Sequence, residues 1–509
     1  MRLFGSSKPG VSRRQAFKVF GTGAVAIAAY EVLDSEIRYP MRPAARTGDN
    51  PLVPENAQAG HDWRAKANGK KDVNDLKRQI QGWASTDSVS RGETIDFHVS
   101  THASSPDCTI SIYRVGHYGG TGSRLMTTSP TVQAKACEVP KFAKDFGTIN
   151  CPWPKTWSLE IPKDWKSGIY IAAFDGADGH RGYHPFTVRE LDRGSDILAI
   201  QPTTTYQAYN IWPMDKVTGK SFYKGYDDRG VLGSLEYRAI KVSYNRPYAQ
   251  HGLPLLFELD AAFARWAEEH GHDVTYATSV DLHEGRIDPE KYSTMVYAGH
   301  DEYWSTEMRR HAEAAYAAGT HQAFLAANSM YWHVRVEDEG RTVTCYKEKD
   351  LKDPDGGENG PTIRWRKLQK KGKAAEQGFL GVQYNGILDY PMPMLVQNTD
   401  HWVWEGTGLK DGDALPNLVA GEADGFDPDM PRPKGVQQVL LSNSPYPDSL
   451  GRGTRIQNTS LCVNKRGTMM FVAGTYHWSL ALAEEGYQDE RVRRAMGNVV
   501  GRMLTQRES

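Results

Sequence analysis

Hydrophobic and polar positions alternate with a period of two between residues 80 and 190, in short segments separated by turn residues. This alternation is typical of strands that bury one face, and no helical period of useful length interrupts it. The expected strands are Thr94–Val99, Thr109–Val115, Trp157–Ile161, Gly168–Phe174 and His184–Val188. The pattern therefore predicts a β-sandwich domain over residues 80–190.

From residue 195 the pattern changes to short apolar runs that alternate with segments of helical periodicity. Leu256, Leu259, Phe263 and Trp266 fall on one helical face, and Gly271 marks the end of that helix. Further elements are expected at Asp196–Ile200, Val274–Ala277, Thr294–Ala298 and Gln322–Ala327 as strands and at Thr306–Ala318 as a helix. Strands that alternate with helices predict a parallel sheet covered on both faces, so residues 195–509 form an α/β domain.

The stretch Met295–Trp304, MVYAGHDEYW, contains the most informative break in this pattern. Its apolar run ends at Gly299 and gives way to polar residues, and Ser305 is the expected cap of the next helix. Open α/β sheets bind ligands where parallel strands end, so one edge of the sheet should collect the polar residues Tyr206, Tyr209, His300, Glu302 and Asn328. A capped loop whose polar residues only hold the helix in place is an equally simple interpretation.

Composition narrows the class of protein. The chain has 509 residues, of which 39% are hydrophobic and 24% charged, and this supports a large globular core. The formal net charge of -1 argues against nucleic acid as the main partner. The cysteines show no zinc-ligand spacing, but Cys137 and Cys151 are close enough in sequence to pair after export.

The N-terminus predicts a targeting signal. Residues 12–18 read SRRQAFK and are followed by the weakly apolar run GTGAVAIAAY. Paired arginines before such a run indicate the twin-arginine export machinery, which would deliver the protein to the periplasm, the cell surface or the medium. Residues 1–34 are assigned to this signal, and residues 35–79, rich in Pro and Ala with mixed charge, to a linker.

The candidate chemistry is that of oxygen donors. The chain has no GxSxG elbow, HExxH motif or Walker loop. A mechanism in which Ser329 is the nucleophile and His300 is its base stays open. Phenols and a carboxylate at the sheet edge suit a hard cation such as ferric iron, although each tyrosine taken alone is more often a tether that uses its hydroxyl.

The motifs TTTYQAYN (203–210), SYNRPY (243–248), GHDEYW (299–304), FLAANSMYWHVR (324–335), TCYK (344–347) and VAGEADG (419–425) occur in this order. Together they resemble the large (beta) subunit of N,N-dimethylformamidase and its wider bacterial family. The resemblance implies an amidotransferase-like (flavodoxin-like) α/β domain with an N-terminal Ig-like β-sandwich. It also implies one Fe³⁺ ion held by two tyrosines and a glutamate.

Carried over to this chain, the resemblance gives the metal ligands as Tyr209, Tyr248 and Glu302, with Tyr206 as the rival of Tyr209. It gives the catalytic pocket residues as His300, Asn328, Lys347 and Glu422. The activity expected on this basis is metal-dependent hydrolysis of a carbon–nitrogen (amide) bond by an exported enzyme. The ion would polarise the carbonyl or a water.

Two other function classes stay open at this point: an exported binding or cell-surface protein without turnover, and an iron-dependent redox enzyme. The expected partners are a small amide-like substrate and the export machinery. A homo-oligomer and the requirement for a separate small subunit are also left open.

Overall fold

The computed structural model describes residues 50–233, 235–347, 353–354 and 360–505, which belong to a unit that begins at Met41. The expected twin-arginine signal (1–34) lies outside the described residues. Within the described residues, no helix is both long enough and apolar enough to cross a membrane. The structure is mixed, with helices and many β-sheets, as the sequence predicts.

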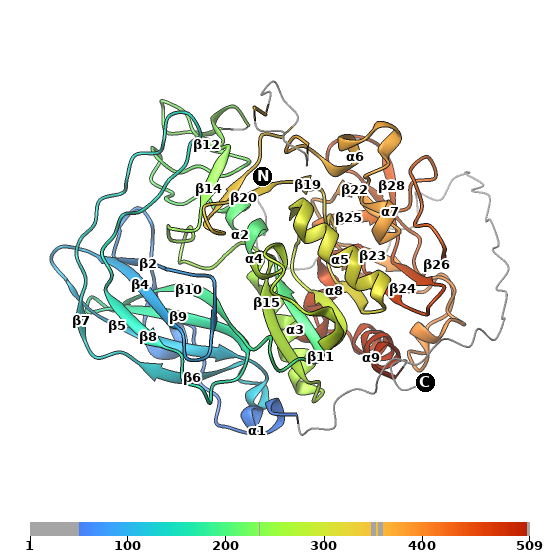
Figure 1. Cartoon of the computed structure of the whole chain (residues 1–509), viewed down its shortest axis with the longest axis horizontal. Coiled ribbons are helices and arrows are strands. Elements are labelled where there is room, and N and C mark those ends of the chain that lie inside the picture. Colours follow the sequence, from blue (N-terminus) through green and yellow to red (C-terminus); the bar gives the residue numbers. More distant parts are fainter. Residues whose placement is uncertain (1–49, 234, 348–352, 355–359, 506–509) are drawn as a thin grey trace, which may run out of the picture. The chain divides into compact units, whose positions relative to one another are not determined.

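Two sheets pack face to face in the N-terminal part (Figure 1). One has the core strand order β10-β9-β5-β6 and the other the order β2-β4-β8. The buried residues of β4, such as Phe97, face those of β9, such as Phe174, in one shared core. The strands are β2 (Ile80–Ala84), β4 (Thr94–Thr101), β5 (Asp107–Val115), β6 (Ser123–Thr128), β8 (Trp157–Glu160), β9 (Gly168–Gly176) and β10 (His180–Arg189).

Cys137 and Cys151 do not form the expected disulfide. Both are free, although both lie in one small apolar cluster beside Trp153. Residues 50–79, expected as linker, include the short helix α1 (Leu52–Asn56), whose Leu52 is 2% exposed. This segment is therefore part of the packed structure from residue 50 onward.

A seven-stranded sheet forms the centre of the remaining chain, in the order β15-β11-β16-β18-β30-β29-β26. The first five strands run parallel, β29 runs antiparallel to β30, and β26 runs antiparallel to β29. Up to residue 324, the strands of this sheet occur where the sequence predicts them. They are β11 (Ser195–Gln201), β15 (Val274–Thr278), β16 (Tyr292–Tyr297), β18 (His321–Phe324), β26 (Val436–Leu440), β29 (Ser460–Asn464) and β30 (Met469–Val472).

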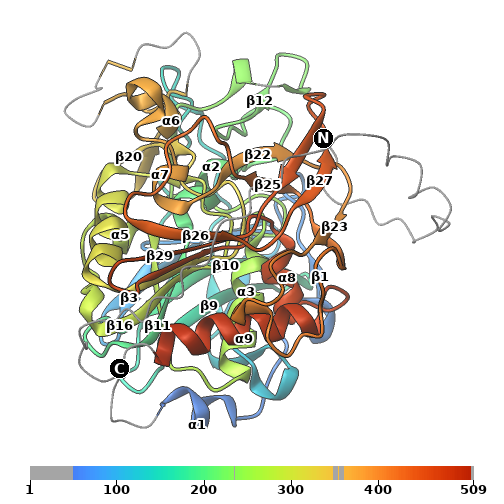
Figure 2. The same ribbon diagram turned by 90° about the vertical axis from the view of Figure 1, so that its right-hand side faces the viewer.

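Helices cover both faces of this sheet, as Figure 2 shows for α5 and α9. Successive side chains of a strand point to opposite faces, and in β11 Ile197 joins one core while Leu198 joins the other. The first core contains α3 (Phe257–Glu269), α8 (His477–Ala483) and α9 (Glu490–Thr505), and the second contains α5 (Thr306–Ala318).

The predicted ends of α5 are observed. The Ser305 hydroxyl accepts a hydrogen bond from the Met308 backbone N–H at 3.1 Å, which is the N-cap that the sequence predicts. Gly319 ends the helix in the left-handed conformation, with φ of 104°. Residues 203–209, which follow the expected strand Asp196–Ile200, form the short helix α2 (Thr203–Tyr209), which the sequence pattern does not predict.

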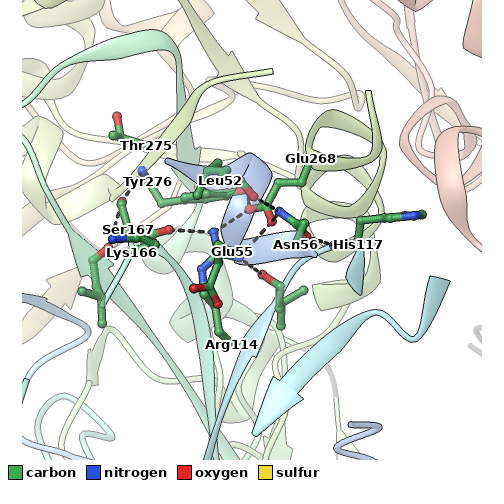
Figure 3. Close-up of polar contacts among 12 residues, drawn as sticks. Leu52, Glu55, Asn56, Arg114, His117, Lys166, Ser167, Glu268, Thr275 and Tyr276 are labelled. Atoms are coloured by element: carbon green, nitrogen blue, oxygen red, sulfur yellow. Dashed lines mark hydrogen bonds and ion pairs between the residues drawn. The ribbon is translucent and has the colours of Figure 1, made fainter. Parts of the chain in front are cut away.

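A buried ion pair joins the sandwich to α3 (Figure 3). The Arg114 guanidinium on β5 donates two hydrogen bonds to the Glu268 carboxylate, at 2.8 and 2.7 Å, and both side chains are 0% exposed. Asn56 of α1 and Tyr276 of β15 donate two more hydrogen bonds to the same carboxylate, at 2.8 and 2.9 Å. Glu268 thus connects four separate segments of the chain.

Removing the charge of Glu268 should be far more costly than removing a surface charge, because Arg114 would be left buried without its counter-charge. We expect Glu268→Gln to lower the free energy of unfolding by about 3 kcal/mol or more. Asp62→Asn, which breaks an ion pair whose arginine is 62% exposed, should cost about 1 kcal/mol at most. Chemical denaturation measures both values, and equal losses would show that the buried pair has no special importance.

Candidate functional site

Four neighbouring parallel strands bring polar residues to one edge of the central sheet. β11 leads into α2, which ends at Tyr209, and β16 leads into His300 and Glu302. β18 leads into Asn328, and β30 leads into Tyr476. The carboxyl ends of parallel strands lie at the same edge, and the hydrogen bonds described below connect all five side chains.

Glu302 is the centre of this cluster. The residue is 1% exposed, and its two carboxylate oxygens accept hydrogen bonds from two different phenols. Tyr209 donates to one oxygen at 2.7 Å and Tyr223 donates to the other at 2.6 Å. The two phenol oxygens are 3.2 Å apart. Two phenols that are 14 residues apart in the chain, and a carboxylate 79 residues beyond the second, therefore place their oxygen atoms around one point.

Tyr223 was not among the residues identified from the sequence. It lies between α2 and the two-residue strand β12 (Gly225–Tyr226), outside the alternation of strands and helices, so the rule of strand ends does not locate it. Neighbouring tyrosines such as Tyr226 and Tyr237 carry the same local signal. Only the fold shows that Tyr223, rather than one of these, reaches Glu302.

The structure places Tyr248 and Tyr206 elsewhere. The Tyr248 ring stacks on His184 of the sandwich, with centroids 5.5 Å apart, and lies edge-on to Tyr206 at 6.4 Å. The Tyr206 hydroxyl donates to the buried carboxyl of Asp260 at 2.5 Å. Of the two rivals for the first tyrosine, Tyr209 is therefore the one beside Glu302, and Tyr223 takes the position expected of Tyr248.

His300 lies between the two acidic side chains of the cluster. Its Nδ1 is 3.1 Å from the Ala327 carbonyl oxygen, which can only accept, so Nδ1 carries a proton. Its Nε2 is 3.3 Å from a Glu302 oxygen and 3.6 Å from a Glu422 oxygen. Burial lowers the pKa of His300, but the hydrogen bond and charge of Glu302 and the charge of Glu422 raise it above its usual value.

Glu422 comes from β25 (Glu422–Gly425), which pairs with β22 (Gln383–Ile387) outside the central sheet. Its carboxylate accepts hydrogen bonds from Asn328 Nδ2, at 2.9 Å, and from the Tyr476 hydroxyl. Burial leaves the pKa of Glu422 above its usual value. Burial also raises the pKa of Glu302, but the hydrogen bond and charge of His300 outweigh this effect, so the pKa of Glu302 is lowered.

Asn328 has a strained backbone and an unsatisfied side chain. Its φ is 56°, in the left-handed region, where asparagine is one of the few residues found routinely. Its backbone N–H donates to Asp424 at 2.8 Å, and Asp424 is on the same strand as Glu422. Asn328 Oδ1 is buried and has no hydrogen-bond partner among the described residues. Such features gather at functional sites.

Lys347 lies beside the phenols rather than beside the carboxylates. Its ammonium group donates to the Tyr303 hydroxyl at 2.7 Å. The same group lies 4.0 Å from the Tyr223 ring centroid and 3.9 Å from that of Trp332. Burial lowers its pKa to about 8, and the aromatic faces partly replace water around the charge.

The alternative of a serine nucleophile gains no support. Ser329 Oγ is buried without a hydrogen-bond partner among the described residues. His300 Nε2 instead contacts the hydroxyls of Tyr209 and Tyr476, at 3.3 and 3.1 Å. A base that activates a serine must lie within hydrogen-bond reach of its hydroxyl.

The oxygen donors fit a hard cation. Ligand oxygens that are each about 2.0–2.2 Å from one ion lie about 3 Å apart, which is the spacing observed here. Among the described residues, no group of three or more His, Cys, Asp and Glu side chains is arranged to hold a metal ion, so any metal at this site depends on the tyrosines. Burial and the charge of Glu302 raise the pKa of Tyr209 and Tyr223 well above the usual value, so a cation must displace their protons.

A family model agrees with this part of the chain. The model is described as N,N-dimethylformamidase beta subunit-like, C-terminal, and it matches residues 109–489, a range that contains every site residue named above. Two curated proteins named N,N-dimethylformamidase beta subunit, from Paracoccus aminophilus and an Alcaligenes species, are each 27% identical to this chain. The match covers 55% of this chain and 42% of each relative, less than half of their length.

Solved structures add little. A superoxide reductase (neelaredoxin) from Ignicoccus hospitalis is 14% identical and covers 22% of this chain and 80% of its own, with a TM-score of 0.14. A cycloisomaltooligosaccharide glucanotransferase from Paenibacillus sp. is 8% identical and covers 64% of this chain and 62% of its own, with a TM-score of 0.18. At these TM-scores neither likeness bears on the fold or the activity.

The buried carboxyl below the site should make stability fall as pH rises. Burial raises the pKa of Asp260 from 3.8 to about 7, so the folded state binds the proton more tightly than the unfolded state does. The resulting stability is complete below about pH 4 and is lost between about pH 4 and 7, at a slope of at most about 1.4 kcal/mol per pH unit.

Asp260→Asn should flatten this slope, because the amide stays neutral and its oxygen can still accept from Tyr206. Urea denaturation at several pH values measures the slope. The wild-type and variant curves should converge at low pH and separate toward pH 7. Parallel curves over the whole range would contradict the raised pKa of Asp260.

Proposed function

Because this chain belongs to the N,N-dimethylformamidase beta subunit-like family, we propose that it hydrolyses an amide carbon–nitrogen bond with a ferric ion held by Tyr209, Tyr223 and Glu302. The observation that supports the proposal is the convergence of two phenols and one carboxylate, with oxygen atoms between 2.6 and 3.2 Å apart. Phenolate and carboxylate oxygens are ligands that suit a hard, highly charged cation.

A bound ferric ion supplies Lewis acidity, which polarises an amide carbonyl and lowers the pKa of water. The protein supplies the groups that move protons. Glu422 has a raised pKa and lies beside His300, so it is suited to accept a proton from water as the water attacks the carbonyl carbon. The raised pKa of His300 keeps a proton available for the departing amine.

Asn328 and Lys347 orient and stabilise rather than transfer protons. Asn328 Nδ2 uses one hydrogen for Glu422 and keeps a second, which can be donated to the oxygen that becomes negative during the reaction. Lys347 holds the Tyr223 ring and the Tyr303 hydroxyl in place and adds a positive charge to the site. This division of roles follows from the contacts of each group.

We extend the family resemblance to the fold. The two facing sheets of the N-terminal part support an Ig-like sandwich, and the five parallel strands between helices support an amidotransferase-like (flavodoxin-like) domain. The paired Arg13 and Arg14 support twin-arginine export of the protein. The relatives' name of beta subunit supports assembly into an oligomer.

Iron content distinguishes the two candidates for the second tyrosine ligand. We expect Tyr223→Phe and Glu302→Ala to lose stoichiometric iron and the visible tyrosinate-to-iron colour, since each removes a ligand oxygen. Tyr248→Phe is the matched control, because this buried tyrosine contacts His184 and not Glu302, and it should keep both. Metal analysis and an absorption spectrum measure the outcome. Loss of iron in Tyr248→Phe with retention in Tyr223→Phe would reverse the assignment.

The activity is tested by incubating the iron-loaded protein with a series of amides that includes N,N-dimethylformamide and longer N-acyl amines. We expect release of amine and carboxylate in equal amounts, no consumption of oxygen, and loss of turnover in Glu302→Ala. Oxygen consumption coupled to substrate loss would favour the iron-dependent redox enzyme. An iron-loaded protein that cleaves no amide in the series would favour the binding protein.

A further inference from the structure

Tyr476 occupies a position that the proposed mechanism leaves without a role. It follows β30 and stands immediately before α8, at the same sheet edge as His300 and Asn328. The side chain is 7% exposed. Its hydroxyl donates to Glu422 Oε2 in a short hydrogen bond and lies 3.1 Å from His300 Nε2. Tyr476 is therefore the residue that touches both proton-transfer groups.

The Tyr476 ring is fixed by the chain segment that carries Glu422. A Cβ atom added at Gly421 would stand 2.3 Å from Tyr476 Cδ2, so the ring lies directly on the Gly421 backbone. Gly421 also has φ of 70°, which glycine adopts without strain. Glu422 is the next residue, so the phenol contacts both the backbone before it and the end of its side chain.

Thr475 strengthens the same junction. Its hydroxyl accepts from the Ala420 N–H at 3.0 Å and donates to the Leu418 carbonyl at 2.7 Å, and its backbone bridges to Ala423. β25, which carries Glu422, is not a strand of the central sheet. The contacts of Thr475 and Tyr476 thus hold Glu422 against a segment that the central sheet positions.

We infer that Tyr476 is the positioning residue that holds Glu422 in its reactive orientation and connects it to His300. The inference rests on the proposed function for its consequence in catalysis, and on the contacts alone for its geometry. The phenol donates its hydrogen to Glu422, and its oxygen can accept from the protonated His300 Nε2.

The consequence is measured at Glu422. The hydrogen bond from Tyr476 stabilises the ionised carboxylate and so lowers its pKa, in opposition to burial. Without the hydroxyl, one of the effects that lower the pKa of Glu422 against burial is lost, so Glu422 should keep its proton to higher pH. The titratable groups that also act on Glu422 through their charge or proton are His300, Glu302, Lys347, Asp424, Tyr209, Tyr223 and Tyr384.

The decisive variant is Tyr476→Phe, which keeps the ring on Gly421 and removes only the hydroxyl. The control is Tyr297→Phe, because Tyr297 is 1% exposed and its hydroxyl has no hydrogen-bond partner among the described residues. Infrared difference spectra over a pH series follow the protonated-carboxyl band, and the part of the band that Glu422→Gln removes identifies Glu422. Tyr476→Phe should move the midpoint of the Glu422 titration to higher pH, and Tyr297→Phe should not. An unchanged midpoint in Tyr476→Phe overturns the inference.

Kinetics and iron content separate this inference from the proposed function. On an amide that the wild type cleaves, Tyr476→Phe should lower kcat by about tenfold to a hundredfold with little change in KM. The double variant with Glu422→Gln should be no slower than Glu422→Gln alone. Iron content and colour should match the wild type, and loss of iron in Tyr476→Phe overturns the assignment as a positioning residue.

Failure of the proposed function gives a different result. A wild-type protein without iron or amide cleavage removes that proposal, but the infrared titration still tests the contact of Tyr476 with Glu422. If Tyr476→Phe does not fold, Gly421→Ala provides the same test, because the added methyl group displaces the Tyr476 ring and should shift the Glu422 midpoint in the same direction. An unchanged midpoint in folded Gly421→Ala overturns the inference as well.

Discussion

The burial of the Glu302 charge is the constraint on which the site depends. A carboxylate that is 1% exposed has lost its water, and only hydrogen-bond donors or positive charges can replace that stabilisation. Two phenols and an imidazole contact it, the charge of Lys347 acts on it from beside the phenols, and the pKa of Glu302 stays below its usual value in spite of burial. The same donors are the groups that the proposed chemistry requires, so the stability and the function of the site share one cause.

Close backbone packing lets these groups reach one another. A Cβ atom at Gly299 would stand 2.2 Å from Asp260 Oδ2, and one at Gly421 would overlap the Tyr476 ring. Each glycine lies one residue before a group with a proposed acid–base role, His300 or Glu422. Asn328 adds a left-handed backbone that Asp424 holds by a hydrogen bond. The site is assembled from positions where the chain passes closer to other atoms than a side chain would allow.

The sandwich contributes to this arrangement through packing. The Arg114–Glu268 pair ties β5 to α3, and α3 packs on the sheet whose strand ends form the site. Tyr248, expected beside the metal ligands, stacks on His184 of the sandwich instead. The tyrosine of the NRPY segment therefore contacts the sandwich, while the position beside Glu302 is occupied by Tyr223 from the loop after α2.

Periodicity alone determined five strands of the sandwich (β4, β5, β8, β9 and β10), the parallel strands up to residue 324 and the capped helix α5, because alternation and helical spacing are local properties. The rule that parallel strands end at one edge also placed Tyr209, His300, Glu302 and Asn328 together. Tertiary structure decided the choice of Tyr223 over Tyr248 and the position of Tyr476 beside Glu422. Each of these contacts joins residues that are at least 50 positions apart in the sequence, and Tyr476 and Glu422 are separated by 54. No local pattern records which side chains a fold brings together.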